Sequence, residues 1–332
     1  MAEARDRRIP LTVLGGYLGA GKTTWLRHQL HAGAMGRVRV IVNEAAEAPV
    51  DDALLGRAAG LTVLAGGPVS GSARAALVAA LRDIANDHSA GDHRASDAAP
   101  DAVVLETSGL ADPAPVVAAI MGDPVLVHHF RLEATLLLVD ARHGLTQLAE
   151  DPLARRQVLG ADRLIVTKTD LAAPAELACL VATLRLLNPG ADIRAAVMGE
   201  TCALPALPDA APAPLPALPD DEAPPQATHL AIGPDTDWTA LTVWLSALLH
   251  ARGDRIVRVK GVIAAPAGRL LLQGVRREVQ RPEIMPASGQ PDARDNLLVL
   301  IGRGYAPADL ARSLAGFTRM RPPPTAPAIT TK

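Results

Sequence analysis

Residues 16–23 read GYLGAGKT, which fits the pattern G-x-x-x-x-G-K-[ST] of a phosphate-binding loop. An apolar run precedes this stretch at 11–14, and a helix is predicted over Thr24–His31, so the loop joins a strand to a helix as the pattern requires. In such a loop backbone N–H groups surround a β-phosphate, Lys22 reaches the β- and γ-oxygens, and the Thr23 hydroxyl ligates magnesium. The alternative, a chance glycine turn, accounts for neither flanking element. The residues expected at the nucleotide are Gly16, Gly19, Ala20, Gly21, Lys22, Thr23 and Thr24.

Short apolar runs continue to alternate with helix-like segments beyond this loop. The runs lie at 38–42, 61–64, 102–105, 136–139, 164–166 and 193–197. This alternation predicts an α/β fold, a P-loop NTPase domain with a mostly parallel sheet and helices on both faces. The runs are apolar at consecutive positions, as strands buried on both sides should be. Most of 83–100 (DIANDHSAGDHRASDAAP) is polar and aperiodic and is predicted to be a mobile surface loop.

Composition divides the chain into four parts. We predict a P-loop domain at 1–202, a Pro/Ala-rich linker at 203–226, a C-terminal domain at 227–320 and a disordered tail at 321–332. Proline recurs through the linker and forbids helix, so a semi-rigid extended segment is expected. Runs at 229–232, 256–264, 270–275 and 297–301 read as strands, and 238–251 and 307–314 read as helices. That order predicts a small α+β domain with a split βαβ arrangement.

Charge and cysteine content limit the partners and the cellular compartment that we expect for this protein. The 33 basic and 35 acidic residues give a net charge of −2, which argues against binding to nucleic acid or an anionic membrane through bulk electrostatics. Two unclustered cysteines, Cys179 and Cys202, are typical of a reducing compartment. No signal-peptide pattern is seen, and runs such as 134–139 fall short of the ~20 apolar residues that span a bilayer. We therefore expect a cytoplasmic protein.

A carboxylate follows the predicted strand at 102–105, where the chain reads ETSG. Ligands of open α/β sheets bind at the carboxyl ends of the strands, so Glu106 is expected to hold magnesium directly or through water. The Gly109 N–H is expected to contact a γ-phosphate, which would make Leu110–Asp112 a nucleotide-sensing segment. The alternative is a strand-end carboxylate that caps the following turn.

A third motif, TKTD at 167–170, follows the predicted strand at 164–166. The Asp170 carboxylate can accept the N1–H and exocyclic N2–H of guanine, whereas adenine offers no such pair of donors, so the motif predicts GTP rather than ATP. Lys168 is expected to lay its aliphatic stem along the base. Thr167 stands where asparagine is usual, and a plain surface loop is the alternative. An ATP-dependent P-loop kinase is disfavoured by Asp170.

Carboxylates also follow the predicted strand at 38–42. Glu44, Glu47, Asp51 and Asp52 could order around magnesium or position the attacking water. Glu44, nearest the strand end, is the favoured catalytic candidate, together with Lys22, Thr23 and Glu106. A solvated acidic loop is the alternative.

Taken together and in this order, four stretches of the chain resemble the CobW-like GTPases. They are GGYLGAGKTT (15–24), NEAAEAPVDDALL (43–55), ETSGLADPAP (106–115) and TKTD (167–170). The likeness continues at 257–275 and 297–302, which are similar to the family's smaller C-terminal domain. The resemblance implies GTP and Mg²⁺ as ligands, a role in metal-cofactor assembly or metal homeostasis, and a client metalloprotein or cofactor-assembly protein as partner.

The chain departs from the family pattern where the family usually carries a Cys-x-Cys-Cys metal motif. Those positions read Pro68, Val69, Ser70 and Gly71, and hydroxyl and backbone groups are poor ligands for zinc or cobalt compared with thiolate. We predict a structural loop that leads into a helix, and no transition-metal site. Four histidines of the same domain, His88, His93, His128 and His129, are predicted to be solvated.

Two functions stay open. The first is a GTP-binding accessory protein that hydrolyses GTP slowly, since no catalytic glutamine or arginine finger is identifiable, and whose nucleotide state controls client docking. The second is a GTP-sensing, protein-binding regulator that has lost metal handling. A hard-ion site built from Glu44, Glu47, Asp112 or Asp123 is a further option. The identity of the client, zinc or cobalt as the metal, and a nucleotide-dependent homodimer stay open as well.

Overall fold

The computed structural model describes most of the chain as two compact units, Met1–Ala227 and Thr228–Lys332, which we treat separately. The described residues are 6, 8–33, 35–43, 58–64, 73–89, 100–217, 226–233, 236–253, 255–265, 268–275, 277–279, 282–284, 296–302 and 304–319. No helix in these ranges is long and apolar enough to cross a membrane.

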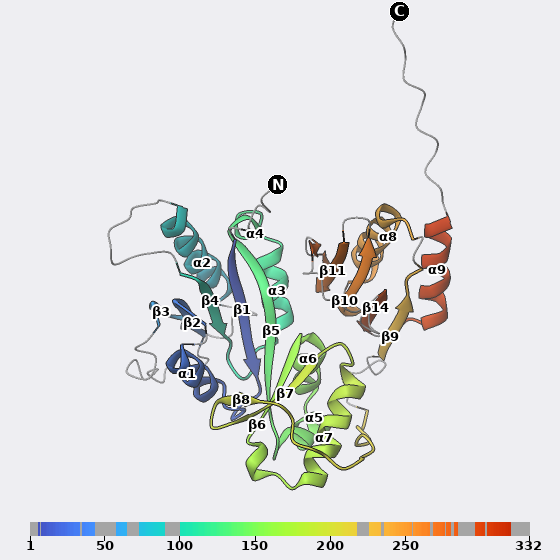
Figure 1. The fold of residues 1–332 in the computed structure, drawn as a ribbon. Coiled ribbons are helices and arrows are strands. Elements are labelled where there is room, and N and C mark those ends of the chain that lie inside the picture. The colour runs from blue at the N-terminus through green and yellow to red at the C-terminus, as the bar shows by residue number, and fades with distance from the viewer. Residues whose placement is uncertain are drawn as a thin grey trace, which may run out of the picture. The chain divides into compact units, whose positions relative to one another are not determined.

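The first unit is built on an eight-stranded sheet in the order β3-β2-β4-β1-β5-β6-β7-β8 (Figure 1). Its strands are β1 (Ile9–Gly16), β2 (Val38–Asn43), β3 (Gly60–Leu64), β4 (Ala102–Glu106), β5 (Phe130–Asp140), β6 (Arg163–Thr167), β7 (Asp192–Val197) and β8 (Glu200–Cys202). All neighbouring strands are parallel except β7 and β8. The mostly parallel sheet predicted from the apolar runs is confirmed.

Helices cover both faces of this sheet, as alternate side chains of β5 show. Leu136 and Leu138 pack with Leu26 of α1 in one core cluster, whereas Leu137 and Val139 pack with residues of α6 and α7 in another. Burial on both faces explains why these strands are apolar at consecutive positions. The helices of this unit are α1 (Lys22–Ala32), α2 (Arg74–Ser89), α3 (Pro113–Met121), α4 (Leu126–His129), α5 (Gly144–Glu150), α6 (Pro152–Gly160) and α7 (Pro174–Leu187), with a 3-10 turn, η2, at Thr169–Leu171.

The structure corrects the prediction of a mobile loop at 83–100. Residues 83–89 are the last turns of α2, and 90–99 lie outside the described residues. The buried side chains Leu77, Leu81, Ile84 and Ala85 follow a helical period, and the polar residues between them face solvent. The polar residues Asp83, Asn86 and Asp87 therefore belong to the exposed face of an amphipathic helix.

The first part of the proline-rich segment is held against the first unit. Residues 203–217 form neither helix nor strand, as expected, but Leu204, Leu207 and Leu215 pack on the core cluster formed with α6 and α7. The Ala213 N–H also donates to Thr183 Oγ1 at 2.8 Å. Residues 203–217 are thus anchored on the first unit, and residues 218–225 lie outside the described residues.

The second unit is a smaller sheet with two helices. Its path is β12-β11-β10-β14-β9, and β13 also pairs with β11. The strands β9 and β10 flank α8 in the chain, yet β14 lies between them in the sheet, so the predicted split arrangement is confirmed. The elements are β9 (Gln226–Ala231), α8 (Trp238–Arg252), β10 (Ile256–Ala265), β11 (Gly268–Val275), β12 (Glu278–Val279), β13 (Glu283–Ile284), β14 (Leu297–Gly302) and α9 (Pro307–Arg319).

Candidate functional site

The glycine-rich loop joins β1 to α1, and its three glycines all take backbone conformations that other residues rarely adopt. Gly21 is the N-cap of α1 with φ 87°, so the helix begins at Lys22 rather than at Thr24. At Gly16, φ is 147° and an added Cβ would lie 2.7 Å from the Leu138 carbonyl oxygen. A helix start behind such a loop points backbone N–H groups and the positive end of the helix dipole outward, which is an anion-binding arrangement.

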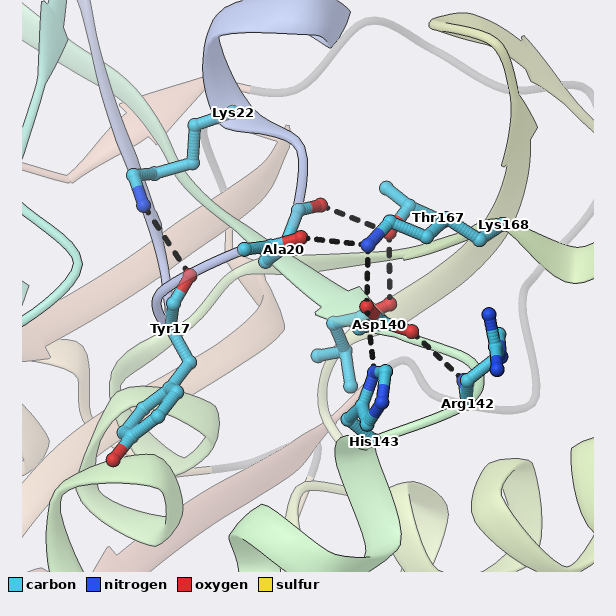
Figure 2. A network of polar contacts seen from close by, with 10 residues as sticks. Tyr17, Ala20, Lys22, Asp140, Arg142, His143, Thr167 and Lys168 are labelled. Carbon is cyan, nitrogen blue, oxygen red and sulfur yellow. Dashed lines mark hydrogen bonds and ion pairs between the residues drawn. The ribbon is translucent and has the colours of Figure 1, made fainter.

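Two side chains of the loop point to specific partners. Lys22 Nζ donates to the Gly16 carbonyl at 2.8 Å and to the Tyr17 carbonyl at 3.3 Å, so the ammonium lies across the loop. Figure 2 shows the contact with Tyr17. Thr23 Oγ1 donates to Glu106 Oε1 at 2.8 Å, and Glu106 is only 3% exposed at the end of β4. The structure thereby brings together the hydroxyl and the carboxylate that the sequence singled out for magnesium. Both offer the hard oxygen atoms that this ion prefers.

The segment after β4 approaches the loop closely at Gly109. An added Cβ there would lie 2.8 Å from Leu18 Cδ2 and 2.9 Å from the Leu18 backbone nitrogen. Thr107 ties the start of the segment to β1, since its N–H and Oγ1 both donate to the Leu14 carbonyl, at 2.9 and 3.2 Å. Gly109 is therefore needed for the backbone of this segment to pack against the backbone of the glycine-rich loop.

The TKTD segment also contacts the loop directly. Thr167 Oγ1 lies 2.9 Å from the Ala20 carbonyl oxygen, and Lys168 Nζ donates to the Gly19 carbonyl at 2.8 Å (Figure 2). Lys168 has φ 57°, in the left-handed region, and Asp170 is exposed at the start of η2. Residues about 150 positions apart in the sequence are thus brought to one edge of the sheet.

Sequence reasoning missed Asp140, the last residue of β5. Its side chain is 3% exposed and accepts hydrogen bonds from Lys168 Nζ at 2.6 Å, the Arg142 N–H at 2.8 Å and His143 Nδ1 at 3.2 Å. Burial raises the pKa of Asp140, but the hydrogen bonds led by that from Lys168 outweigh burial and hold the pKa below its ordinary 3.8. The sequence did contain a signal, since Asp140 directly follows the apolar run at 134–139, but without the fold it marks only the end of that run.

Sequence reasoning also missed the contacts of α6. Gln157, which is 1% exposed, donates its amide to the Ala111 carbonyl at 2.7 Å and the Gly109 carbonyl at 3.4 Å. Asp151 caps the helix and accepts the Tyr17 hydroxyl at 2.5 Å, which raises the pKa of Tyr17 above 10.0. No local pattern signals these contacts, because the partners lie far apart in the sequence. One helix therefore contacts both the glycine-rich loop and the segment after β4.

Several residues expected at the site lie outside the described residues or do not converge. Glu44, Glu47, Asp51, Asp52, the positions Pro68–Gly71 and His93 lie outside the described residues. Asp112 and Asp123 cannot share one ion, because they flank the nine-residue helix α3, which spans about 14 Å. Asp112 caps this helix through the Ala114 N–H, and Asp123 pairs with Arg82 at 2.8 Å. Among the described residues, no group of three or more His, Cys, Asp or Glu is arranged to hold a metal.

The doubly wound sheet, the glycine-rich turn before α1 and the strand-end Glu106 define a P-loop nucleotide-binding protein. The chain belongs to the CobW/HypB/UreG family: the model of that nucleotide-binding domain matches residues 10–194. The model of the cobalamin synthesis protein cobW C-terminal domain matches residues 227–318. The fold and the family predicted from the four motifs are confirmed.

Relatives of this chain are named as zinc chaperones. The zinc chaperone YjiA of Escherichia coli is 38% identical over 169 residues, which are 51% of this chain and 52% of YjiA. The zinc chaperone CobW of Pseudomonas aeruginosa is 29% identical over 366 aligned positions, which cover 92% of this chain and 91% of CobW. The sequence match thus spans about half the length of the first relative and nearly all of the second.

Solved structures show the same fold. A zinc-bound triple mutant of the YjiA GTPase matches with a TM-score of 0.63 at 26% identity, over 94% of this chain and 99% of that one. The zinc-bound YjiA GTPase from E. coli matches with a TM-score of 0.61 at 24% identity, over 93% and 99%. The chain is therefore related to a metallochaperone-like group of P-loop GTPases.

Proposed function

We propose that this protein binds GTP with Mg²⁺, hydrolyses it slowly, and uses its nucleotide state to control docking on a client in metal-cofactor assembly or metal homeostasis. One observation carries the nucleotide part: the TKTD segment is bonded to the phosphate loop through Thr167–Ala20 and Lys168–Gly19. That contact supports one ligand with a triphosphate at the loop and a purine at Asp170. GTP matches this pattern of contacts.

The phosphate end is served by the loop itself. The N–H groups of residues 19–22 would surround the β-phosphate, and Lys22 would exchange the Gly16 and Tyr17 carbonyls for phosphate oxygens. Thr23 and Glu106, already within hydrogen-bond distance, would hold Mg²⁺. When bound, the ion neutralises charge on the β- and γ-phosphates. The chain's own contribution is to position these groups at one edge of the sheet.

Slow turnover follows from how the nearby side chains are used. Hydrolysis of GTP needs a group that orients the attacking water. Gln157 contacts the segment after β4, but its amide N–H groups already donate to the carbonyls of Ala111 and Gly109 and are not directed at a water. Glu44, chosen from the sequence, is the residue that we propose positions the attacking water. We propose that a partner completes the site and raises the rate.

Two of the contacts that α6 makes support control by nucleotide state. Gln157 holds the segment that would sense the γ-phosphate, and Arg155 on the same helix donates to the Pro216 carbonyl at 2.7 Å. Arg155 also donates to the Leu148 carbonyl at 2.6 Å, which fixes its position. A shift of residues 109–111 on γ-phosphate binding would therefore act on α6 and, through it, on the end of the anchored stretch 203–217. Such coupling requires an element with two arrangements, for which we propose α6.

A second candidate, a GTP-sensing regulator without metal handling, is favoured by the sequence at 68–71. The chain has only two cysteines, Cys179 in α7 and Cys202 in β8, and neither lies at the family's metal-motif positions. The relatives' zinc-chaperone names favour the first candidate. Titrating the GTP-loaded and nucleotide-free protein with zinc or cobalt separates the two, since tight binding near one equivalent would contradict the regulator.

The nucleotide assignment is tested by changing the base specificity. Asp170→Asn should weaken GTP binding on the order of 100-fold, because the asparagine side chain can accept from only one of the two guanine N–H groups and does so without a negative charge. The same variant should gain affinity for xanthosine triphosphate, because the C2 oxygen of xanthine can accept a hydrogen bond from the asparagine amide. Lys22→Ala, with its turnover compared, serves as the phosphate-side control. An Asp170→Asn protein with unchanged GTP affinity would contradict guanine recognition by this residue.

A further inference from the structure

The buried carboxylate of Asp140 stands between the two halves of the proposed nucleotide site. In the sheet β5 lies between β1, which leads into the phosphate loop, and β6, which leads into the TKTD segment. Near the end of β5, Leu138 pairs with Gly16 on one side and Asp140 pairs with Thr167 on the other. Asp140 is thus placed where both segments leave the sheet.

Lys168 spans the gap between these segments, and Asp140 is the charged group that meets it (Figure 2). The ammonium lies 2.6 Å from Asp140 Oδ2 and 2.8 Å from the Gly19 carbonyl oxygen. A neutral carbonyl alone is a weaker partner than a carboxylate, because charge-assisted hydrogen bonds are about twice as strong as neutral ones. The carboxylate is the stronger of the two contacts that fix the end of this long side chain.

The backbone of Lys168 needs such support. Its φ of 57° lies in the left-handed region, which is unfavourable for a residue with a Cβ and persists only where the surroundings enforce it. The same residue sets the direction of the chain into η2, where Asp170 lies. Releasing the side chain would therefore also release the turn that presents Asp170.

Among the described residues, the groups that hydrogen-bond to the Asp140 carboxylate are donors, which suits an ionised carboxylate. Besides Lys168 they are the Arg142 N–H and His143 Nδ1. The depressed pKa of Asp140 agrees with this geometry, since the residue then stays charged at neutral pH despite its burial. An asparagine at this position would keep the shape, but it would lose the charge and turn part of the side chain into a donor.

We propose that Asp140 is a positioning residue for guanine recognition, which holds Lys168 against the phosphate loop so that Lys168 and Asp170 meet the base in register with the phosphates. This inference rests on the proposed function. Asp140 acts through Lys168 and does not itself contact the nucleotide. Its loss should therefore affect contacts with the base more than contacts with the phosphates.

The test compares Asp140→Asn with the wild-type protein for GDP and ADP affinity by calorimetry in the presence of Mg²⁺. We expect the GDP affinity to fall about 10-fold, the worth of one charge-assisted contact, and the ADP affinity to change less than threefold. Lys168→Met should lower the ratio of GDP affinity to ADP affinity (the GDP-to-ADP ratio) by a similar factor. The double variant should show no further loss of GDP affinity, because both changes remove the contact between Asp140 and Lys168. A merely structural role would lower the melting temperature and leave the ratio unchanged.

Asp162→Asn is the matched control. Asp162 is a buried aspartate that precedes β6 and accepts the Thr135 N–H at 2.8 Å, at the opposite end of the strand from the phosphate loop. Its substitution should lower stability without changing the GDP-to-ADP ratio. If Asp140→Asn fails to fold, Lys168→Met carries the test, because the Lys168 side chain is 36% exposed and methionine keeps its apolar stem, so packing should be disturbed less than by a change at the buried Asp140.

The outcomes separate the two proposals. A wild-type protein without preference for GDP over ADP would overturn the proposed function. A wild-type preference that survives in Asp140→Asn or Lys168→Met, or losses that add in the double variant, would overturn only the role of Asp140. A retained melting temperature with a reduced GDP-to-ADP ratio would support it.

Discussion

Replacing Gly109 by alanine should weaken nucleotide binding, because the added methyl group has no room beside the phosphate loop. Its Cβ would lie 2.8 Å from Leu18 Cδ2, 2.9 Å from the Leu18 nitrogen and 3.0 Å from Leu18 Cα. The side-chain atom can rotate away, but the two backbone atoms belong to the loop and cannot. Either the segment after β4 or the loop must therefore shift.

The size of the effect follows from this geometry. Inserting a methyl group into a closely packed site typically costs about 1–3 kcal/mol. Where the shifted element is the phosphate loop, that cost falls on binding, which corresponds to a loss of roughly 5- to 150-fold in affinity. GDP should be affected as well as GTP, because the loop serves the β-phosphate that both nucleotides carry.

The assay measures the dissociation constants of GDP and of a non-hydrolysable GTP analogue by titration calorimetry. Gly160→Ala is the matched control: it is also a buried glycine of the same unit, but its added Cβ would lie 3.5 Å from Ala114 Cβ, an ordinary contact. As a helical Gly→Ala change it should raise stability by up to about 1 kcal/mol and leave nucleotide binding unchanged. Wild-type GDP affinity in Gly109→Ala would refute the reasoning, and a loss confined to the GTP analogue would mean that only the γ-phosphate contact matters.

Three further outcomes can be measured. Lys22→Ala should reduce the rate of GTP hydrolysis on the order of 100-fold or more in a phosphate-release assay, because the charge aimed at the β- and γ-oxygens is removed. Arg155→Met should lower the urea midpoint and speed proteolysis within 203–217, since the hydrogen bond to Pro216 is lost, while GDP affinity stays near wild type. The pKa of Asp140 is lower in the folded protein than in the unfolded chain, so the ionised carboxylate stabilises the fold. This stabilisation is complete above the unfolded-state pKa near 3.8 and is lost as the pH falls through the lower folded-state pKa. The difference in unfolding free energy between wild type and Asp140→Asn should therefore shrink below about pH 4 in urea titrations.

The central strands could be predicted because burial on both faces leaves a direct mark on the sequence. Every apolar run from 11–14 to 193–197 became part of a strand, and in the central strands such as β1, β4 and β5 most positions must be apolar whichever face they point to. The edge strand β8 was missed because its residues Glu200–Cys202 are exposed and polar, and only backbone pairing with β7 makes them a strand. Residues 83–89 were missed because polar residues crowd the exposed face of α2.

The motif residues of the site could be predicted, but the contacts that connect the motifs could not. The spacing within GYLGAGKT is set by the local backbone conformation of the loop, so the motif can be recognised from one short stretch of sequence. The bonds from Gln157 to Ala111 and from Asp140 to Lys168 join positions 46 and 28 residues apart, and only the packed sheet brings them together. Polar residues with such partners look like ordinary strand-end or helix residues until the fold is known.

The replacement of the usual asparagine by Thr167 gives the contact between Lys168 and Asp140 added weight. A threonine hydroxyl has one hydrogen to donate, yet Thr167 Oγ1 faces two acceptors, the Ala20 carbonyl at 2.9 Å and the Val139 carbonyl at 3.3 Å. An asparagine amide has two hydrogens and could serve two carbonyls at once. With one donor fewer at position 167, the link between the phosphate loop and the end of β6 depends more on Lys168, and so on the carboxylate that holds it. Thr167→Val, which removes that remaining donor, should therefore weaken GDP binding further in an Asp140→Asn background than the two separate losses predict.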